Sequence, residues 1–216
     1  MAELRVFTGI DARLQLDRLR TRQLNFDPES LPRLLHESGW HIDHHRAPLL
    51  SEAPGEPSSG GPWATARGLC SAYKFIDPAI LRAFYDPEER LEHRTMLLEV
   101  HFWGLRIYAG VRAGGSFDGY RTESGRRARV WGWNYRTLAG HFEQGQIDYE
   151  VWKWLDTGEV EFRINAVSRR ADAEHPLINI GFLLFGRNKQ IEFARTACER
   201  MAELTRRELA ARLTRS

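Results

Sequence analysis

The fold is decided by residues 127–169, which read RARVWGWNYRTLAGHFEQGQIDYEVWKWLDTGEVEFRINAVSR. Apolar and polar residues alternate in successive runs along this stretch, and a period of two residues is that of a half-buried strand. The triplet Asp156-Thr157-Gly158 divides the second run from the third in the manner of a hairpin turn. We therefore expect antiparallel strands over residues 127–136, 144–155 and 159–169.

The same alternation begins earlier, at Thr95. Residues 95–102 and 105–111 each carry an apolar residue at every second position, and Gly104 lies between them as a bulge or bend. Glycines between positions 114 and 125 predict turns around one short strand before the aromatic strand begins. The centre of the chain thus predicts an antiparallel meander with one buried face.

After Pro176 the period changes to that of a helix. Apolar residues recur every three to five positions from Leu177 to Leu213, which predicts one long helix. At 1.5 Å per residue this helix would be about 55 Å long, so it has to cross the whole sheet. Helices, then a meander, then one long helix predict an α+β protein of the helix-grip kind, in which a curved antiparallel sheet wraps a C-terminal helix. We expect a concave apolar cavity between the two.

Two regions precede the meander. We expect residues 1–39 to form a helical segment that packs on a single helix-grip domain of residues 40–216, because an amphipathic spacing occurs within them. The stretch Ser51–Gly61, SEAPGEPSSGG, concentrates Gly, Ser and Pro, has no apolar residue beyond Ala53, and predicts a mobile surface loop. Pro62 suits the first position of a following helix, and residues 80–85 predict a second, short helix.

The composition excludes several classes of protein. The chain carries 31 Lys plus Arg and 29 Asp plus Glu, and this net charge of +2 does not favour nucleic acid as a partner. No apolar run approaches the ~20 residues of a membrane span, and the start has no apolar leader, so we expect a cytoplasmic protein without stable membrane insertion. Cys70 and Cys198 are too few for a disulfide framework or a thiolate zinc site. The common nucleotide, nucleophile and zinc motifs are absent, and we expect no cofactor.

Candidate metal ligands cluster in residues 39–46, GWHIDHHR. On a strand, His41, Asp43 and His45 share one face, and His44 lies on the other. Side chains two apart on a strand are about 7 Å apart, too far to grip one ion, so we expect no metal site. The alternatives are a solvated or backbone-capping cluster, or a general acid–base group made of His41, Asp43 and His44.

The turn after the aromatic strand is a second candidate site. Its glycines allow a tight turn that holds His141 at the end of the sheet, with Tyr135 and Thr137 pointing back along the strand. His141 then either faces a ligand, oriented by Glu143 or Asp148, or only satisfies backbone groups together with Thr137.

A third candidate is Ser168-Arg169-Arg170, at the end of the last predicted strand. A guanidinium there is able to pair with a ligand carboxylate or phosphate. The alternative is an ion pair with a nearby acid, such as Asp172 or Glu174.

Aromatic residues on neighbouring strands either line a ligand cavity or pack under the long helix. They are Trp131, Trp133, Tyr149, Trp152, Trp154 and Phe162. Alternation places Trp152 and Trp154 on the face opposite Tyr149, and we expect the N-terminal helices to cover that face. Exposed tryptophans that bind another protein are the alternative, which would make the chain an interaction domain.

Four stretches resemble the uncharacterised DUF1990 family, also described as UPF0548-type proteins. They are GWHIDHHR, YRTLAGHFEQGQIDYEV, NAVSRRA and GRNKQIEFAR with Gln190, and they run from Trp40 to about Met201. In this family a YGTLPGH-like turn precedes a GEE-like strand and an SRP-like ending. This chain departs at Arg136 in place of Gly, at Ala139 and Arg170 in place of Pro, and at Gln146 in place of Glu. The resemblance implies a fold akin to the START and Bet v 1 type, and it implies no established activity.

The sequence therefore predicts a protein that binds a hydrophobic or amphipathic small molecule, lipid-like or polyketide-like, in the cavity under the long helix. The residues expected to orient this ligand are Tyr135, Thr137, His141, Tyr149 and Arg169. The alternative is an enzyme that acts on such a ligand, with His141 or the His41, Asp43 and His44 group as general acid and base. The identity of the ligand and the oligomeric state stay open.

Overall fold

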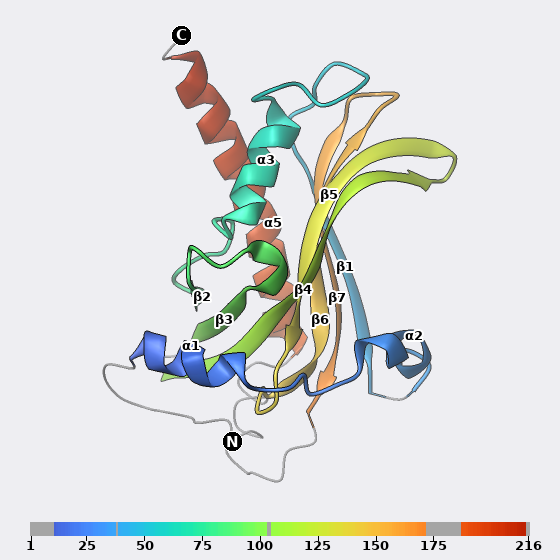
Figure 1. Ribbon diagram of the computed structural model, residues 1–216. Helices are drawn as coiled ribbons and strands as arrows, with labels where there is room; N and C mark the ends of the chain where they lie inside the picture. The colour runs from blue at the N-terminus through green and yellow to red at the C-terminus, as the bar shows by residue number, and fades with distance from the viewer. Residues whose placement is uncertain (1–10, 38, 103–104, 172–186, 215–216) are drawn as a thin grey trace.

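The computed structural model describes residues 11–37, 39–102, 105–171 and 187–214. Seven strands form one antiparallel sheet in the order β1-β7-β6-β5-β4-β3-β2 (Figure 1). They are β1 (His41–Pro48), β2 (Leu81–Phe84), β3 (Thr95–Phe102), β4 (Leu105–Glu123), β5 (Arg126–Thr137), β6 (Glu143–Trp154) and β7 (Val160–Arg170). The helices are α1 (Ala12–Arg20), α2 (Leu31–Leu34), α3 (Pro62–Ser71) and α5 (Arg187–Leu213), with 3-10 turns η1 (Pro28–Ser30) and η2 (Leu91–His93).

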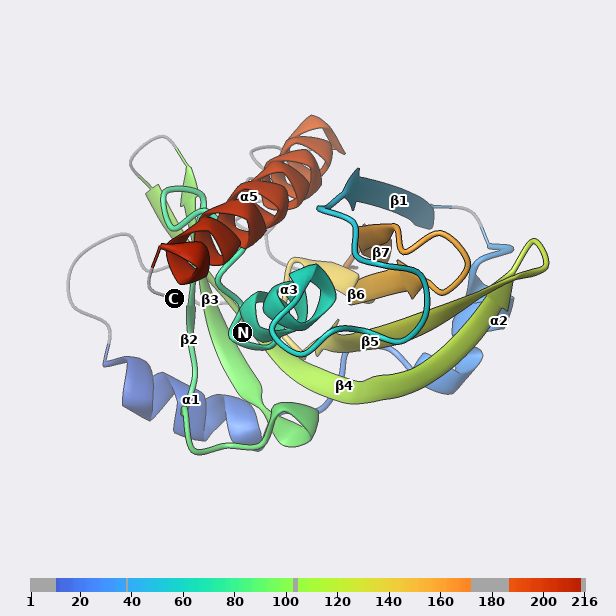
Figure 2. The same ribbon diagram turned by 90° about the horizontal axis from the view of Figure 1, so that it is seen from above.

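The predicted meander is confirmed. Strands β3 to β7 pair in chain order, and Tyr149 of β6 lies opposite Trp133 of β5 and Ile164 of β7. The sheet curves around α3 and α5, which lie on the same side of it (Figure 2). Inward-facing strand residues share one apolar core with Cys198 and Met201 of α5. The α+β class and the helix-grip arrangement follow from this packing, because the sheet buries its apolar face against the last helix.

The C-terminal helix α5 spans 27 residues from Arg187, about 40 Å at 1.5 Å per residue. The predicted start at Leu177 lies outside the described residues. None of the helices in the described ranges is long and apolar enough to cross a membrane.

Two predicted local structures are wrong. Residues 81–84 form the edge strand β2, which pairs with β3, instead of a helix. Four closely spaced apolar residues fit a short helix or a short strand equally well, and here the hydrogen bonds of the sheet edge decide. Residues 114–119 belong to the long strand β4, which keeps its pairing with β5 through a bulge between Ala113 and Gly115. A bulge bends a strand without ending it, so the glycines make no separate turn there.

The loop of residues 51–61 is fastened to the sheet by a buried ion pair. Its Glu52 carboxylate lies 3.0 Å from Nζ of Lys153 on β6, and the two side chains are 2% and 0% exposed. The same carboxylate accepts backbone N–H bonds from Ser58 and Trp63, both at 2.7 Å. Lys153 also donates to the carbonyl of Glu56 at 2.9 Å. Composition alone had suggested a mobile loop, but these contacts hold it against the concave face of the sheet.

Helix α1 packs on the convex face of the sheet, over β3 and β4. Its Leu16 and Leu19 form a small apolar cluster with Leu97 and Leu138. The helix approaches closely because β4 has a glycine beneath it. A Cβ atom on Gly110 would lie 2.3 Å from Cδ2 of Leu19.

The outward tryptophans of β6 are covered by arginine side chains, so the prediction that N-terminal helices cover them is wrong. Arg163 lies 3.8 Å from the ring centroid of Trp152, and Arg126 lies 4.5 Å from that of Trp154. Arg163 also contacts the indole of Trp154, and Arg121 contacts the indole of Trp152. Guanidinium groups and indoles therefore alternate along this face of the sheet.

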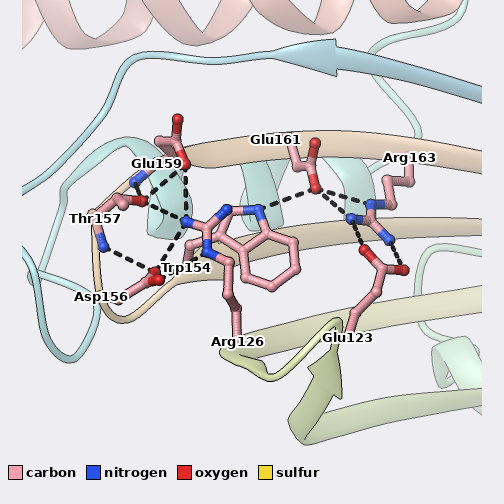
Figure 3. Close-up of polar contacts among 8 residues, drawn as sticks. All are labelled: Glu123, Arg126, Trp154, Asp156, Thr157, Glu159, Glu161 and Arg163. Atoms are coloured by element: carbon pink, nitrogen blue, oxygen red, sulfur yellow. Dashed lines mark hydrogen bonds and ion pairs between the residues drawn. The ribbon is translucent and has the colours of Figure 1, made fainter.

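Acidic side chains hold this stack in place (Figure 3). Arg163 makes two hydrogen bonds to Glu123 at the tip of the β4–β5 hairpin, at 2.9 and 2.8 Å. Arg126 binds Asp156 and Glu159 in the turn before β7. Because Trp152 and Trp154 are only 4% and 7% exposed, they offer no tryptophan surface to a partner protein. The interaction-domain alternative loses the observation that motivated it.

Candidate functional site

A cavity of about 120 Å³ lies on the concave face, between the sheet and the beginning of α5. Its walls are mainly apolar and include Leu81, Leu98, Val100, Phe142, Ile147 and Phe193. Its titratable and hydroxyl groups include Asp43 and His45 of β1, Tyr135 and Thr137 of β5, His141 in the turn, and Glu143 of β6. No Lys or Arg is among the described residues that line it.

The cavity is small because α3 and an aromatic cluster fill the rest of the concave face. Tyr73, just after α3, packs its ring edge-on against Phe75 and Trp133, with centroids 5.2 and 5.6 Å apart. Phe75 does the same against Tyr149 and Phe162 at 4.9 and 5.0 Å. Edge-to-face contacts of this kind are typical of packed cores. The packing interpretation of the inward aromatics is therefore confirmed, and none of the six aromatic residues singled out in the sequence lines the cavity.

The turn after β5 has the tight geometry that its sequence predicts. Gly140 has a φ of +88°, in the left-handed region that glycine enters without strain. His141 is buried, and its Nδ1 accepts the backbone N–H of Glu143 at 2.9 Å. The proton of the neutral ring is therefore on Nε2. Burial lowers the pKa of His141 to about 4, so the imidazole is uncharged at neutral pH.

Thr137 closes the same turn and ties the N-terminal segment to it. Its Oγ1 accepts the N–H of Gly145 at 2.9 Å and donates to Oδ1 of Asn25 at 2.6 Å. The amide of Asn25 in turn donates to the carbonyl of Glu143 at 2.7 Å. Thr137 lines the cavity, but these contacts with backbone and with Asn25 occupy its hydroxyl. No pattern in the sequence indicates a role for Asn25, which lies 112 residues before Thr137.

Glu143 has a different role from the one that the sequence predicts. The sequence predicts that its carboxylate orients His141, but the group that contacts the His141 ring is the backbone N–H of Glu143. The side chain lines the cavity and accepts a hydrogen bond from Nε2 of Gln190 on α5. Burial raises the pKa of Glu143 to about 7, opposed by the bond from Gln190 and reinforced by the charge of Asp43. Its place two residues after His141, at the start of the next strand, was the available signal.

The other predicted orienting residue, Asp148, lies away from the cavity. Its carboxylate accepts two bonds from Nε2 of Gln146, at 3.0 and 3.1 Å. It does not reach His141 in this structure.

The histidine cluster of β1 is divided between the two faces of the sheet, as the period of two requires. Asp43 and His45 line the cavity. His44 lies on the convex face, where its Nδ1 is 2.8 Å from Oδ1 of Asn165, and His41 is exposed and does not line the cavity. The structure thus does not bring His41, Asp43 and His44 together as one acid–base group. Within the described ranges, no three His, Cys, Asp or Glu side chains are placed to hold a metal ion.

Two of the predicted ligand-orienting residues are not on the cavity wall. Arg169 packs over the ring of Trp40 at 5.0 Å and donates from Nε to Oε1 of Gln144 at 2.7 Å, with Glu37 at 3.7 Å. Tyr149 is fully buried behind Tyr135. Tyr135, Thr137 and His141 do line the cavity. Ser168 of β7 lines the cavity as well.

The pH dependence of stability tests the environment of Glu143. A carboxyl group with a pKa near 7 in the native protein and about 4.5 in the unfolded chain makes the native state lose stability as pH rises from 4.5 to 7. We expect the wild type to lose up to about 3 kcal/mol relative to Glu143→Gln across this range, measured by urea unfolding. The depressed pKa of His141 works in the opposite direction, adding stability as pH rises from about 4 to 6.5, and it cancels because both proteins retain it. Parallel pH profiles for the two proteins would contradict the assignment.

Comparisons with solved structures find distant likenesses. Among solved structures, norcoclaurine synthase from Thalictrum flavum, as a point mutant with a transition-state analogue, has a TM-score of 0.45 and 7% identity, over 77% of this chain and 94% of that chain. Ara h 8.0201 has a TM-score of 0.40 and 9% identity, over 76% and 98%. Ginseng major latex-like protein 151 from Panax ginseng has a TM-score of 0.38 and 11% identity, over 72% and 97%. Likeness this distant says nothing about activity.

No curated protein matches the sequence. The family model described as "Domain of unknown function (DUF1990)" matches residues 27–200, which include β1 to β7, the turn at His141 and the cavity-lining part of α5. The chain belongs to the DUF1990 family.

Proposed function

We propose that the protein binds a compact, mainly apolar small molecule with one polar group in the cavity between the sheet and α5. The observation that carries this proposal is the cavity itself, which is lined mainly by apolar side chains and also by the polar groups of Tyr135 and Glu143. An interior that served only stability would gain by filling this space, since cavities in cores are destabilising.

The size of the cavity narrows the ligand class that the sequence suggested. Drug-sized ligands occupy pockets of roughly 300–1,000 Å³, whereas an apolar cavity of roughly 150 Å³ is enough for benzene. A space of about 120 Å³ therefore suits a single ring or a short branched chain. A long lipid chain or a fused polyketide would require α5 to move away from the sheet.

The charged groups around the cavity restrict the charge that the ligand can carry. Asp43 and Glu143 both line it without a lining Lys or Arg among the described residues. An anionic ligand would be repelled by any ionised carboxylate there, and the described lining residues offer it no guanidinium or ammonium group. We propose that the ligand is neutral or cationic.

Cavity-filling substitutions test the proposal. The probes are toluene, benzyl alcohol and benzoate, and their binding is followed by amide chemical shifts of the protein. The two neutral probes should bind more tightly than the benzoate anion. Ala109→Leu and Ala194→Leu add side-chain volume from β4 and α5 and should each weaken toluene binding by at least about tenfold. Ala210→Leu, at an exposed position of α5 outside the cavity, is the matched control and should bind like the wild type.

Two results would refute the binding proposal. One is unchanged toluene affinity in both filled variants. The other is the absence of binding by every probe, together with no small molecule retained in native mass spectrometry of the protein purified from its own host.

A second candidate function is an acid–base enzyme acting on the same ligand, and Glu143 is the observation that favours it. A general acid or base works best when its pKa lies near the working pH, and Glu143 meets that condition better than His141. Turnover that follows one ionisation near pH 7 and disappears in Glu143→Gln would support the enzyme. Turnover that survives in Glu143→Gln would exclude Glu143 as the acid–base group, and the absence of turnover in the wild type would exclude the enzyme.

A further inference from the structure

Three tyrosine hydroxyls meet inside the core, next to the cavity. The hydroxyl of Tyr73 lies 3.3 Å from that of Tyr149, and the hydroxyl of Tyr149 lies 3.3 Å from that of Tyr135. Their rings are packed against one another, with centroid distances of 5.8 Å for Tyr73 with Tyr149 and for Tyr135 with Tyr149. All three side chains are at most 8% exposed. Tyr135 alone lines the cavity.

Counting protons gives this chain of hydroxyls a direction. Each phenol has one O–H to donate, and Tyr149 donates its proton to Tyr135. The hydroxyl of Tyr73 has two neighbouring phenols, Tyr149 and Tyr135, to which it can donate its proton. In either case the oxygen of Tyr135 accepts, from Tyr149 alone or from Tyr149 and Tyr73 together. The hydrogen bonds of the three hydroxyls therefore converge on Tyr135.

The hydroxyl of Tyr135 is the end of this chain that lies at the cavity wall. It accepts the bond from Tyr149, so its own proton is not used in that bond and can be donated to a molecule in the cavity. Burial raises the pKa of Tyr135 above its ordinary value, against the effect of the bonds it accepts, so it remains a neutral O–H donor at physiological pH. Hydrogen bonds in a chain polarise one another, so a phenol that accepts such a bond becomes a stronger donor.

We propose that Tyr135 donates a hydrogen bond to a neutral acceptor oxygen of the ligand, such as a ketone, aldehyde or amide carbonyl, and thereby selects carbonyl compounds. This inference rests on the proposed binding function and adds the class of polar group. An ammonium group has no lone pair to accept the Tyr135 proton. A carboxylate ligand would accept it but would meet Asp43 and Glu143 in the same cavity.

The experiment compares two probes of the same shape. Cyclohexanone and methylenecyclohexane differ only in a carbonyl oxygen or a methylene group at one position. We expect the ratio of the affinity for cyclohexanone to that for methylenecyclohexane, here called the preference, to be about tenfold higher in the wild type than in Tyr135→Phe, while the affinity for methylenecyclohexane stays the same in both proteins. The C=O stretching frequency of bound cyclohexanone should be lower in the wild type than in Tyr135→Phe, because accepting a hydrogen bond weakens the carbonyl bond.

Further variants separate recognition from folding. Tyr149→Phe keeps the Tyr135 hydroxyl but removes the bond donated to it, so the preference and the frequency shift should be reduced without being lost. Tyr120→Phe is the control, since Tyr120 is 44% exposed and its hydroxyl binds Glu56 on the surface.

The outcomes distinguish this inference from the function on which it rests. Methylenecyclohexane that binds equally to wild type and Tyr135→Phe, with an unchanged preference and C=O frequency, would overturn the Tyr135 inference alone. If neither probe binds the wild type, the binding function itself fails.

Discussion

Lys153→Met is expected to destabilise the protein by about 3–5 kcal/mol, because it leaves the Glu52 carboxylate buried without its cation. Burial opposes ionisation of Glu52, and the N–H groups of Ser58 and Trp63 together with Lys153 hold its pKa below the ordinary value. Removal of the ammonium breaks that balance and releases the loop of residues 51–61 from β6. Urea unfolding at pH 7 measures the loss.

The double variant Lys153→Met, Glu52→Gln supplies the control for this prediction. It removes both charges and keeps an amide oxygen for one backbone N–H, so it should recover more than half of the stability lost in Lys153→Met. Replacing a buried ion pair as a unit costs far less than removing one partner. A single substitution that costs less than about 1 kcal/mol, the value of an exposed pair, would show that the pair contributes little.

Gly145→Ala is expected to destabilise the protein by about 3 kcal/mol or more. Gly145 of β6 lies opposite Ser168 of β7, and a Cβ atom there would be 2.1 Å from the carbonyl oxygen of Val167 and 2.8 Å from Cα of Ser168. Both are backbone atoms of the neighbouring strand, so the clash is relieved only if the two strands separate. The same separation would open one wall of the cavity.

Gly68→Ala is the matched control. Gly68 lies within α3, and no atom lies within 4 Å of the position its Cβ would take. Alanine in a helix interior is favoured over glycine, so Gly68→Ala should stabilise the protein by about 0.5–1 kcal/mol. Thermal unfolding of both variants decides the matter. Equal melting temperatures would show that β6 and β7 have room for a methyl group at position 145.

The buried lysine shows how far the alternating pattern of β6 reached. The inward series Ile147, Tyr149 and Val151 continues to Lys153, which the structure buries completely. The alternating pattern does not indicate the partner of this lysine, because Glu52 is 101 residues away in a stretch whose composition suggests a loose loop. A lysine at an inward position is a signal that a buried carboxylate exists, since an unpaired buried charge is costly.

The candidate site divides in the same manner. Local sequence predicted the tight turn at Gly140, the place of His141 at the end of the sheet, and Tyr135 and Thr137 as residues beside it. It did not predict the hydrogen bonds that connect this site to distant parts of the chain. Gln190 reaches Glu143 from α5, and Tyr73 reaches Tyr149 from the segment after α3, across 76 residues.

By itself, the sequence determined the central meander of strands from Thr95 to Arg169 and the helix-grip class, because a repeat of two or about 3.6 residues is local and survives in any surroundings. Only the tertiary structure decided that the cavity is small, that arginines cover the outer tryptophans, and that Glu143 and Tyr135 face the same space. Those features depend on contacts between residues far apart in the chain and on the volume left after α3 and the aromatic core are packed. Periodicity states which face a side chain occupies, and packing determines what it meets there.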